Sequence, residues 1–257
     1  MTGRVDPDDR SGLKWKLKHH DLSQLWFQLS EIVNDRTYLR HGITVEPGDV
    51  VVDAGANVGV AAAFFLEECG ASEVLSFEPV PAIYEMLADN MTRFPGGRTW
   101  MAGLSDESGT AEFTYYEGAA AMSSRYADPG RDRDSVKSVL TDRGLSEGEA
   151  DEQIEGDFDP QVVTCELVTL SSVIEAEDVQ RIDLLKIDVE RAELDVLRGI
   201  DHGHWPRIRQ VVAEVHDEDG RLAELRAMLE EQGFEVSVDQ EANMKDTGVV
   251  MIYASRP

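Results

Sequence analysis

A glycine-rich turn directly after a short apolar segment constrains the fold of this chain more than any other feature. Residues 49–53 read Asp-Val-Val-Val-Asp, the composition of a strand that is buried on both faces. The turn over residues 53–59 continues Asp-Ala-Gly-Ala-Asn-Val-Gly, and residues 60–68 predict a helix that ends before Gly70. A buried strand, a glycine turn and a helix in this order are typical of the first unit of an open α/β sheet.

The same alternation of strand and helix recurs along the chain. Apolar segments predict four more strands, at residues 73–77, 98–104, 182–187 and 210–215. Three helices are predicted between and after them, at residues 81–93, 190–198 and 221–232. A closing hairpin is predicted from strands at 234–238 and 249–254. These units predict a Rossmann-like α/β fold, with a mostly parallel seven-stranded sheet and an antiparallel closing strand.

Three segments lie outside this alternation. Residues 1–12 are polar and predict a flexible N-terminus, and residues 13–40 predict a helical segment ahead of the main domain at 41–257. An insertion at about 115–160 has little strand signal and is strongly acidic from residue 141 onward. Long insertions of this kind are functional lids or disordered segments, and we predict a partly helical lid over the substrate.

The charge balance limits the partners of the chain. Its 24 basic and 51 acidic residues give a net charge of −27, which disfavours nucleic acids and anionic membranes. The two cysteines, Cys69 and Cys165, form no metal-binding motif and predict no disulfide framework. No apolar segment approaches the roughly 20 residues that span a bilayer, and the N-terminus is not a signal peptide. We therefore expect a cytoplasmic protein.

The turn after the first strand is the first candidate for a ligand site. Gly55 allows close approach of the backbone to a ligand, and Gly59 allows close packing of the next helix. Asp53 places a carboxylate where the ammonium group of a cofactor could lie. Asn57 stands where the dinucleotide fingerprint has its second glycine, and its side chain would crowd a pyrophosphate. The turn therefore favours a methionine–adenosine cofactor, which has no phosphates.

The ends of the second and third strands offer further cofactor contacts. Glu78, followed by Pro79, stands where an acid commonly binds both ribose hydroxyls. Ser105 and Asp106 follow the third strand, where Asp106 could accept a hydrogen bond from the adenine amine.

The segments 52–59, 77–79 and 185–190, taken in order, resemble the FkbM family of methyltransferases. The resemblance extends from about residue 38 to residue 253. It implies a class I enzyme that uses S-adenosyl-L-methionine and most often methylates oxygen atoms of natural products and sugars. The family's cofactor roles would fall on Asp53, Gly55, Asn57, Glu78 and Asp106. The chain departs from the family at Arg191, where a glycine usually follows Asp-Val-Glu.

The ends of the fourth and fifth strands carry the candidate reactive groups. Asp188 ends the fourth strand beside the expected methyl group, and Glu214 and His216 share one face of the fifth. One hypothesis makes His216 a general base that Asp188 or Glu214 orients. A second makes Asp188 and Glu214 ligands of Mg²⁺ that acidifies the acceptor hydroxyl. The third is catalysis by positioning alone, without a strong base or a metal.

These residues predict methyl transfer to a hydroxyl of a small molecule, such as a natural product, a glycoside or a carrier-tethered intermediate. Three alternatives remain at this point. They are an N- or carboxyl-methyltransferase on the same fold, an NAD-dependent oxidoreductase, and a binding protein without catalysis. The N-terminal helices are candidates for a homodimer interface.

Overall fold

The computed structural model describes residues 15–142, 144–218, 220–240 and 248–256, so the predicted flexible segment 1–12 lies outside them. The main sheet of the described chain has seven strands in the order β3-β2-β1-β7-β8-β10-β9. In this sheet β10 alone runs opposite to the other six strands. The predicted Rossmann-like fold is therefore confirmed. The strands are β1 (Val50–Ala54), β2 (Glu73–Phe77), β3 (Gly97–Trp100), β7 (Leu184–Ile187), β8 (Gln210–His216), β9 (Glu235–Asp239) and β10 (Val249–Ser255).

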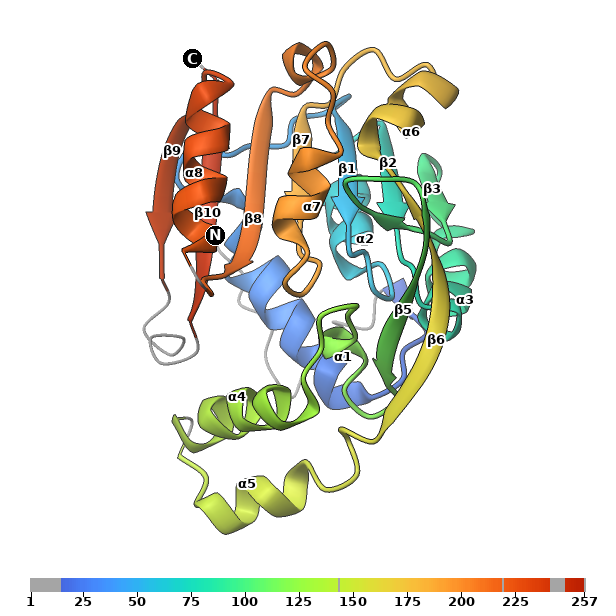
Figure 1. The fold of residues 1–257 in the computed structure, drawn as a ribbon. Helices are drawn as coiled ribbons and strands as arrows, with labels where there is room; N and C mark the ends of the chain where they lie inside the picture. The colour runs from blue at the N-terminus through green and yellow to red at the C-terminus, as the bar shows by residue number, and fades with distance from the viewer. Residues whose placement is uncertain (1–14, 143, 219, 241–247, 257) are drawn as a thin grey trace.

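Helices cover both faces of this sheet because successive strand residues point to opposite sides. Val51 and Leu184 pack on the side of α2 and α3, whereas Val52 and Leu185 pack on the side of α6, α7 and α8. Figure 1 shows the second group of helices in front of the sheet. The helices are α2 (Val60–Glu67), α3 (Pro81–Met91), α6 (Leu170–Ala176), α7 (Glu193–Arg198) and α8 (Arg221–Glu231).

A second sheet, which the sequence patterns did not predict, has three strands in the order β4-β6-β5. The strands are β4 (Gly103–Leu104), β5 (Gly109–Tyr116) and β6 (Pro160–Val168). The single strand predicted over residues 98–104 is therefore wrong in extent. Its first part, β3, pairs with β2, and its last part, β4, pairs with β6 in the other sheet. The β5–β6 ribbon extends below the main sheet toward the insertion (Figure 1).

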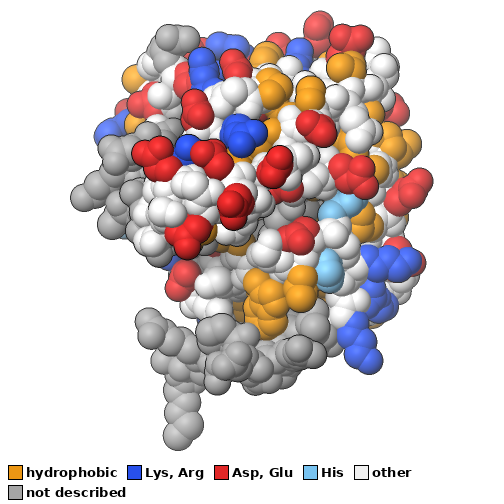
Figure 2. Space-filling view, turned by 90° about the horizontal axis from the view of Figure 1, so that it is seen from below, with side chains coloured by type: hydrophobic (Ala, Val, Ile, Leu, Met, Phe, Trp, Pro, Cys, Tyr) orange, Lys and Arg blue, Asp and Glu red, His pale blue; other side chains and the backbone are white. Residues whose placement is uncertain are grey.

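The insertion between β5 and β6 is largely helical. It contains a 3-10 helix, η4 (Ala120–Met122), followed by α4 (Pro129–Asp142) and α5 (Glu147–Gln153). Tyr116, Ile154 and Phe158 form a small apolar cluster that holds these pieces together. In Figure 1, α4 and α5 lie below the ends of the main strands. Figure 2 views the molecule from this side and shows Asp and Glu side chains scattered widely over the face.

The N-terminal segment is helical from Leu22 onward. The side chain of Asp21 caps α1 (Leu22–Gln28), which continues as a π-helix, η2 (Leu29–Asn34), and a 3-10 helix, η3 (Thr37–Leu39). The amide of Gln24 donates to the backbone oxygen of Gly118, so that α1 contacts the insertion. No helix among the described residues is long and apolar enough to cross a membrane. Cys69 and Cys165 are both free and buried.

Candidate active site

A cavity of about 730 Å³ lies where β1, β2, β7 and β8 end. Seven predicted site residues line it: Gly55, Asn57, Glu78, Pro79, Asp188, Glu214 and His216. α1 and η2 contribute Gln24, Phe27, Gln28 and Glu31 to the opposite wall, and the insertion contributes Val136, Val139, Leu140, Ile154 and Phe158. The cavity is therefore lined by backbone and carboxylates at the strand ends, and by apolar side chains from the insertion together with polar ones such as Arg131, Ser135 and Asp157.

Contacts within the protein determine the conformation of the glycine turn. Gly55 has φ +75°, and a Cβ on it would lie 1.7 Å from the backbone oxygen of Asp188. Any larger residue would therefore displace the Asp188 backbone. Asn57 has φ +49°, a conformation that asparagine tolerates, and its side-chain oxygen accepts from the Val58 amide. Its side chain is thus bound back onto the turn at the edge of the cavity.

Asp53 does not line the cavity. It is fully buried, and its Oδ1 lies 2.9 Å from Nζ of Lys186, the residue opposite it on β7. Lys186 also donates to the backbone oxygen of Gly55 at 2.8 Å. Burial raises the pKa of Asp53, and the lysine charge partly offsets that rise. The ammonium group that Asp53 binds in this structure is therefore the chain's own, where the sequence predicted that of a cofactor.

Glu78 is the buried carboxylate at the end of β2. It is 6% exposed, and its two oxygens accept from the backbone amides of Asn57 at 3.1 Å and Val80 at 3.0 Å. Burial raises the pKa of Glu78 to about 7, although both amides act in the opposite direction. Two fixed oxygens at the cavity edge can still accept from a diol, because each carboxylate oxygen has further lone-pair capacity.

Ser105 and Asp106 lie outside the cavity, which ends at Gly103 and Leu104 on this side. Ser105 is buried and accepts from Arg125 at 3.1 Å, whereas Asp106 is exposed. The switch of the chain from β3 to the second sheet carries these two residues past the cavity wall. The structure therefore does not bring them to the predicted cofactor contact.

Asp188 and Glu214 are the carboxylates at the centre of the cavity. Oδ2 of Asp188 accepts from the Tyr38 hydroxyl at 2.8 Å and lies 3.7 Å from Nζ of Lys186. Burial, together with the negative charges of Asp188 and Glu31, raises the pKa of Glu214 well above its ordinary value. Among the described residues, no Lys or Arg forms an ion pair with the carboxylate of Glu214.

His216 lies between two carboxylates that the sequence analysis did not assign to it. Its Nδ1 is 3.1 Å from Glu193 Oε1, and its Nε2 is 3.2 Å from Glu190 Oε2. Burial would lower the pKa of His216, but these two charges raise it well above its ordinary value. The expected partners Asp188 and Glu214 do not orient the ring. An imidazole whose two nitrogens both lie beside carboxylates is stabilised in its charged form and is therefore poorly suited to act as a general base.

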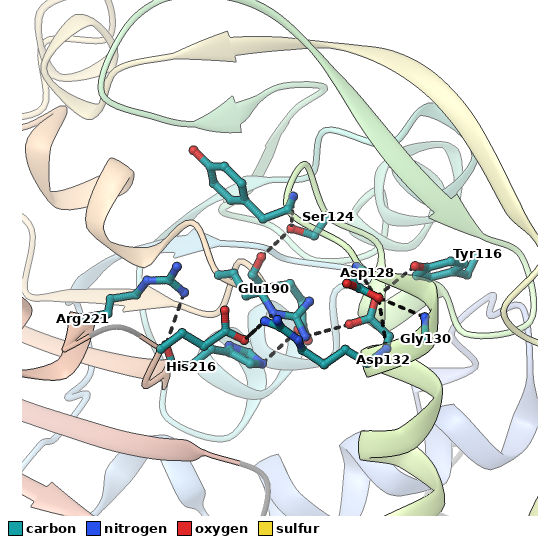
Figure 3. A network of polar contacts seen from close by, with 12 residues as sticks. Tyr116, Ser124, Asp128, Gly130, Asp132, Glu190, His216 and Arg221 are labelled. Carbon is teal, nitrogen blue, oxygen red and sulfur yellow. Dashed lines mark hydrogen bonds and ion pairs between the residues drawn. The ribbon is translucent and has the colours of Figure 1, made fainter.

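Arg191 has a left-handed backbone conformation, which glycine adopts more readily than arginine. Glu190 and Arg191 have φ +50° and +73°, so α7 begins only at Glu193 and the predicted helix start at residue 190 is wrong. Nη2 of Arg191 lies 2.7 Å from the fully buried Asp132 of α4, which also accepts from the Tyr116 hydroxyl at 2.9 Å. Figure 3 shows this network. The strained turn is thereby tied to the insertion.

The structure brings together a different set of candidate metal ligands from the set that the sequence predicted. Glu190, Glu214 and His216 each offer a ligand atom within 4.8 Å of the other two, and Asp188 is not part of that group. The sequence analysis did not predict that Glu190 and Glu193 contact His216, because both contacts depend on the left-handed turn at residues 190–191. The sequence offered one indication of this contact, which is that Glu193 is an acid inside the predicted helix 190–198.

The chain is similar in sequence to known methyltransferases. A model of the methyltransferase FkbM domain matches residues 53–236. The chain is 37% identical to a 31-O-demethyl-FK506 methyltransferase, FkbM, of Streptomyces tacrolimicus, over 93% of this chain and 92% of that protein. It is 31% identical to the methyltransferase sdnD of Sordaria araneosa, over 88% of each chain.

Two further matches involve longer chains. The chain is 36% identical to a segment of the AMB antimetabolite synthetase AmbE of Pseudomonas aeruginosa, over 92% of this chain but only 12% of AmbE. Among solved structures, an FkbM methyltransferase from Methylobacillus flagellatus KT matches with a TM-score of 0.55 and 14% identity. That match covers 84% of this chain and 46% of the other, and supports the fold.

Proposed function

The chain belongs to the FkbM family of methyltransferases, and from this premise we propose that it transfers the methyl group of S-adenosyl-L-methionine to a hydroxyl oxygen of a small natural product. One observation carries the proposal: a single cavity joins the glycine turn and Glu78 to the carboxylates of Asp188 and Glu214. The insertion adds apolar side chains such as Val139, Leu140 and Phe158 to the lining of the same cavity. Such a cavity has room for a polar cofactor at one end and an apolar acceptor at the other.

The names of two relatives support this choice of acceptor. The relative from Streptomyces tacrolimicus is named for an O-demethyl substrate, and AmbE is named as an antimetabolite synthetase. A hydroxyl of a natural product, free or tethered to a carrier, is the acceptor most in keeping with both names. The acidic face seen in Figure 2 disfavours phosphate-rich acceptors such as nucleic acids.

The residues at the polar end fit the cofactor. Gly55 and Asn57 form a turn with left-handed backbone conformations, and Glu78 presents a buried carboxylate at its edge. Glu78 would hold the ribose hydroxyls, and Asn57 would lie beside the nucleoside. When bound, the cofactor supplies a methyl group on a sulfonium that needs no further activation. The chain's own task is to position the acceptor in line and to receive its proton.

Asp188 is the group that we assign to the acceptor proton. Its side chain is 26% exposed and lines the cavity at the end of β7, and Tyr38 and Lys186 hold it in place. His216 is less suitable, because Glu190 and Glu193 engage both of its ring nitrogens. A positioned carboxylate at hydrogen-bond distance from the hydroxyl can act as a general base.

Isotope transfer tests the proposed function. The full-length protein is incubated with cofactor that carries a trideuterated methyl group and with candidate hydroxyl-bearing polyketides, peptides and glycosides. We expect a mass increase of one labelled methyl group, which fragmentation places on oxygen. Label on nitrogen or on a carboxylate would refute O-methylation. Thermal stabilisation by NAD and not by S-adenosylhomocysteine would refute the cofactor.

The pKa of Glu78 predicts that binding of S-adenosylhomocysteine depends on pH. Ribose hydroxyls donate to the ionised carboxylate, so binding requires Glu78 to lose its proton. With a pKa of about 7, lowering the pH from 8 to 6 should weaken the affinity about tenfold. Isothermal titration calorimetry at both pH values measures the change.

Two variants complete that measurement. Glu78→Gln should bind more weakly at pH 8 and lose the pH dependence, since its amide does not titrate. Asp106→Asn is the matched control, because Asp106 lies outside the cavity, and it should retain the wild-type pH profile. If Asp106→Asn removed the pH dependence and Glu78→Gln kept it, the adenosine end of the site would have been assigned to the wrong carboxylate.

A further inference from the structure

Three side chains with metal-binding atoms meet at the floor of the cavity. Glu190 follows β7, and Glu214 and His216 share one face of β8 near its end. One ligand atom of each lies within 4.8 Å of the other two. One imidazole and two carboxylates form a set that suits divalent first-row metal ions.

A buried oxygen of Glu190 lacks a hydrogen-bond donor. Glu190 is 8% exposed, and its Oε2 accepts no hydrogen bond from the residues that the structure describes. Nε2 of His216 lies 3.2 Å away, within ion-pair distance. Two ligands that each stand about 2.1 Å from one metal ion are themselves about 3 Å apart. The two atoms are therefore placed to share a cation.

A buried carboxylate fixes the orientation of the His216 ring. Glu193 is fully buried, and its Oε1 lies 3.1 Å from Nδ1 of His216 and accepts from the Arg191 backbone amide at 2.8 Å. Because a carboxylate accepts, Nδ1 donates to it. A histidine that binds a metal typically donates its other ring N–H to a carboxylate in this way. Nε2 then remains directed toward Glu190.

The negative charge of this cluster is not balanced by basic side chains. Across the part of the chain that the structure describes, no Lys or Arg nitrogen makes an ion pair with Glu190 or Glu214, and His216 is the one cationic partner of Glu190. The nearby Lys186 and Arg191 pair instead with Asp53 and Asp132. Two neighbouring carboxylates that share no ion pair with a Lys or Arg attract a divalent cation.

We propose that Glu190, Glu214 and His216 bind one divalent first-row metal ion, such as Mn²⁺, which replaces the proton on Nε2 of His216. This set differs from the Mg²⁺ site expected at Asp188 and Glu214, since an imidazole ligand favours transition metals. The catalytic consequence rests on the proposed function: a bound ion would polarise the acceptor hydroxyl and ease loss of its proton. Asp188 remains free to receive that proton.

Direct metal binding tests the proposal. The full-length protein is treated with EDTA, dialysed, and titrated with Mn²⁺ by calorimetry and by electron paramagnetic resonance of the free ion. We expect one Mn²⁺ per chain. Glu190→Gln, Glu214→Gln and His216→Gln should each weaken binding at least about tenfold. Retained binding of S-adenosylhomocysteine shows that each variant is folded.

A second acidic cluster provides the matched control. Glu175, Asp201 and His204 also lie within ligand distance of one another, but Glu175 and Asp201 are exposed to solvent. His204→Gln should leave Mn²⁺ binding unchanged. The proposal is wrong if the wild type binds no Mn²⁺ at millimolar concentration, or if His204→Gln abolishes a site that the three cavity variants retain.

A spectroscopic measurement needs no variant. Pulsed electron paramagnetic resonance of the Mn²⁺-loaded wild type should show coupling to one imidazole nitrogen, and absence of that coupling would overturn the assignment. Failure of metal binding with normal methyl transfer would contradict this inference alone. Normal metal binding without methyl transfer to any acceptor would contradict the proposed function alone.

Discussion

Lys186→Met should lower the free energy of unfolding by about 3–5 kcal/mol, because it leaves the fully buried Asp53 without its counterion. Neither oxygen of Asp53 has another hydrogen-bond partner in the described structure, so no second donor takes over. Urea unfolding at pH 7.5 measures the loss of unfolding free energy. This pH lies roughly one unit above the usual histidine pKa, so that histidine titration contributes little.

The loss should shrink as the pH is lowered. Burial already raises the pKa of Asp53, and removal of the lysine raises it further. A carboxyl whose pKa is higher in the folded than in the unfolded protein destabilises the fold at pH values above its folded pKa. This penalty shrinks as the pH is lowered below the folded pKa. The variant should therefore approach the wild type in acid.

Two further variants separate the buried charge from general damage. Asp53→Leu combined with Lys186→Met should recover most of the stability, since removing both members of a buried pair is often neutral. Arg226→Met breaks an exposed pair with Glu230 and should cost less than about 1 kcal/mol. A loss below about 1 kcal/mol for Lys186→Met would show that Asp53 is neutral or solvated in the folded protein.

The parts of the fold that the sequence predicted are those with strong local signals. Buried parallel strands read as continuous apolar segments, and β1, β2, β7 and β8 were found close to their observed bounds. Glu78, Asp188 and Glu214 line one cavity because the carboxyl ends of neighbouring parallel strands meet at the same edge. Their places follow from the order of strands, which the alternation of elements already implies.

The second sheet gave no such signal. In β6 only Cys165 and Leu167 are buried, so most of the strand has the composition of a solvent-exposed segment. Its pairing with β5 joins residues 44 to 58 positions apart, from Tyr116↔Pro160 to Gly109↔Leu167, with the insertion between them. A short period-two alternation is nevertheless present, because Phe113 and Tyr115 on β5 and Cys165 and Leu167 on β6 are buried with less buried residues between them. The sequence analysis did not recognise these two short patterns as strands. The position of Ser105 and Asp106 outside the cavity accompanies this unpredicted sheet, because they directly follow β4.

The sequence also did not predict which charged residues pair with one another. Asp53 faces Lys186 because the two residues are in register on β1 and β7, and that register requires the fold. Glu190 and Glu193 reach His216 through a left-handed turn at Arg191, where sequence preference favours glycine. Ion pairs within a site are properties of three-dimensional packing, and residue type alone does not assign them.

Asp188→Asn should lower kcat by about 10²–10⁴-fold if Asp188 receives the acceptor proton. The amide keeps the shape of the side chain and can still accept from the Tyr38 hydroxyl, so the position of the group should change little. Affinity for S-adenosylhomocysteine should stay within a few-fold of the wild type. Single-turnover methyl transfer measures the rate, and calorimetry measures the affinity.

The identity of the acceptor distinguishes a base from a residue that only positions. An acceptor with a more acidic hydroxyl needs less help in losing its proton, so the defect of Asp188→Asn should shrink along a series of increasingly acidic acceptors. A purely positioning role would give the same defect for all of them. Tyr38→Phe removes one hydrogen bond to Asp188 and should cost only about tenfold, the equivalent of roughly 1–1.5 kcal/mol. A defect in Asp188→Asn no larger than that of Tyr38→Phe would remove Asp188 from the chemical step and leave the metal ion or positioning to carry it.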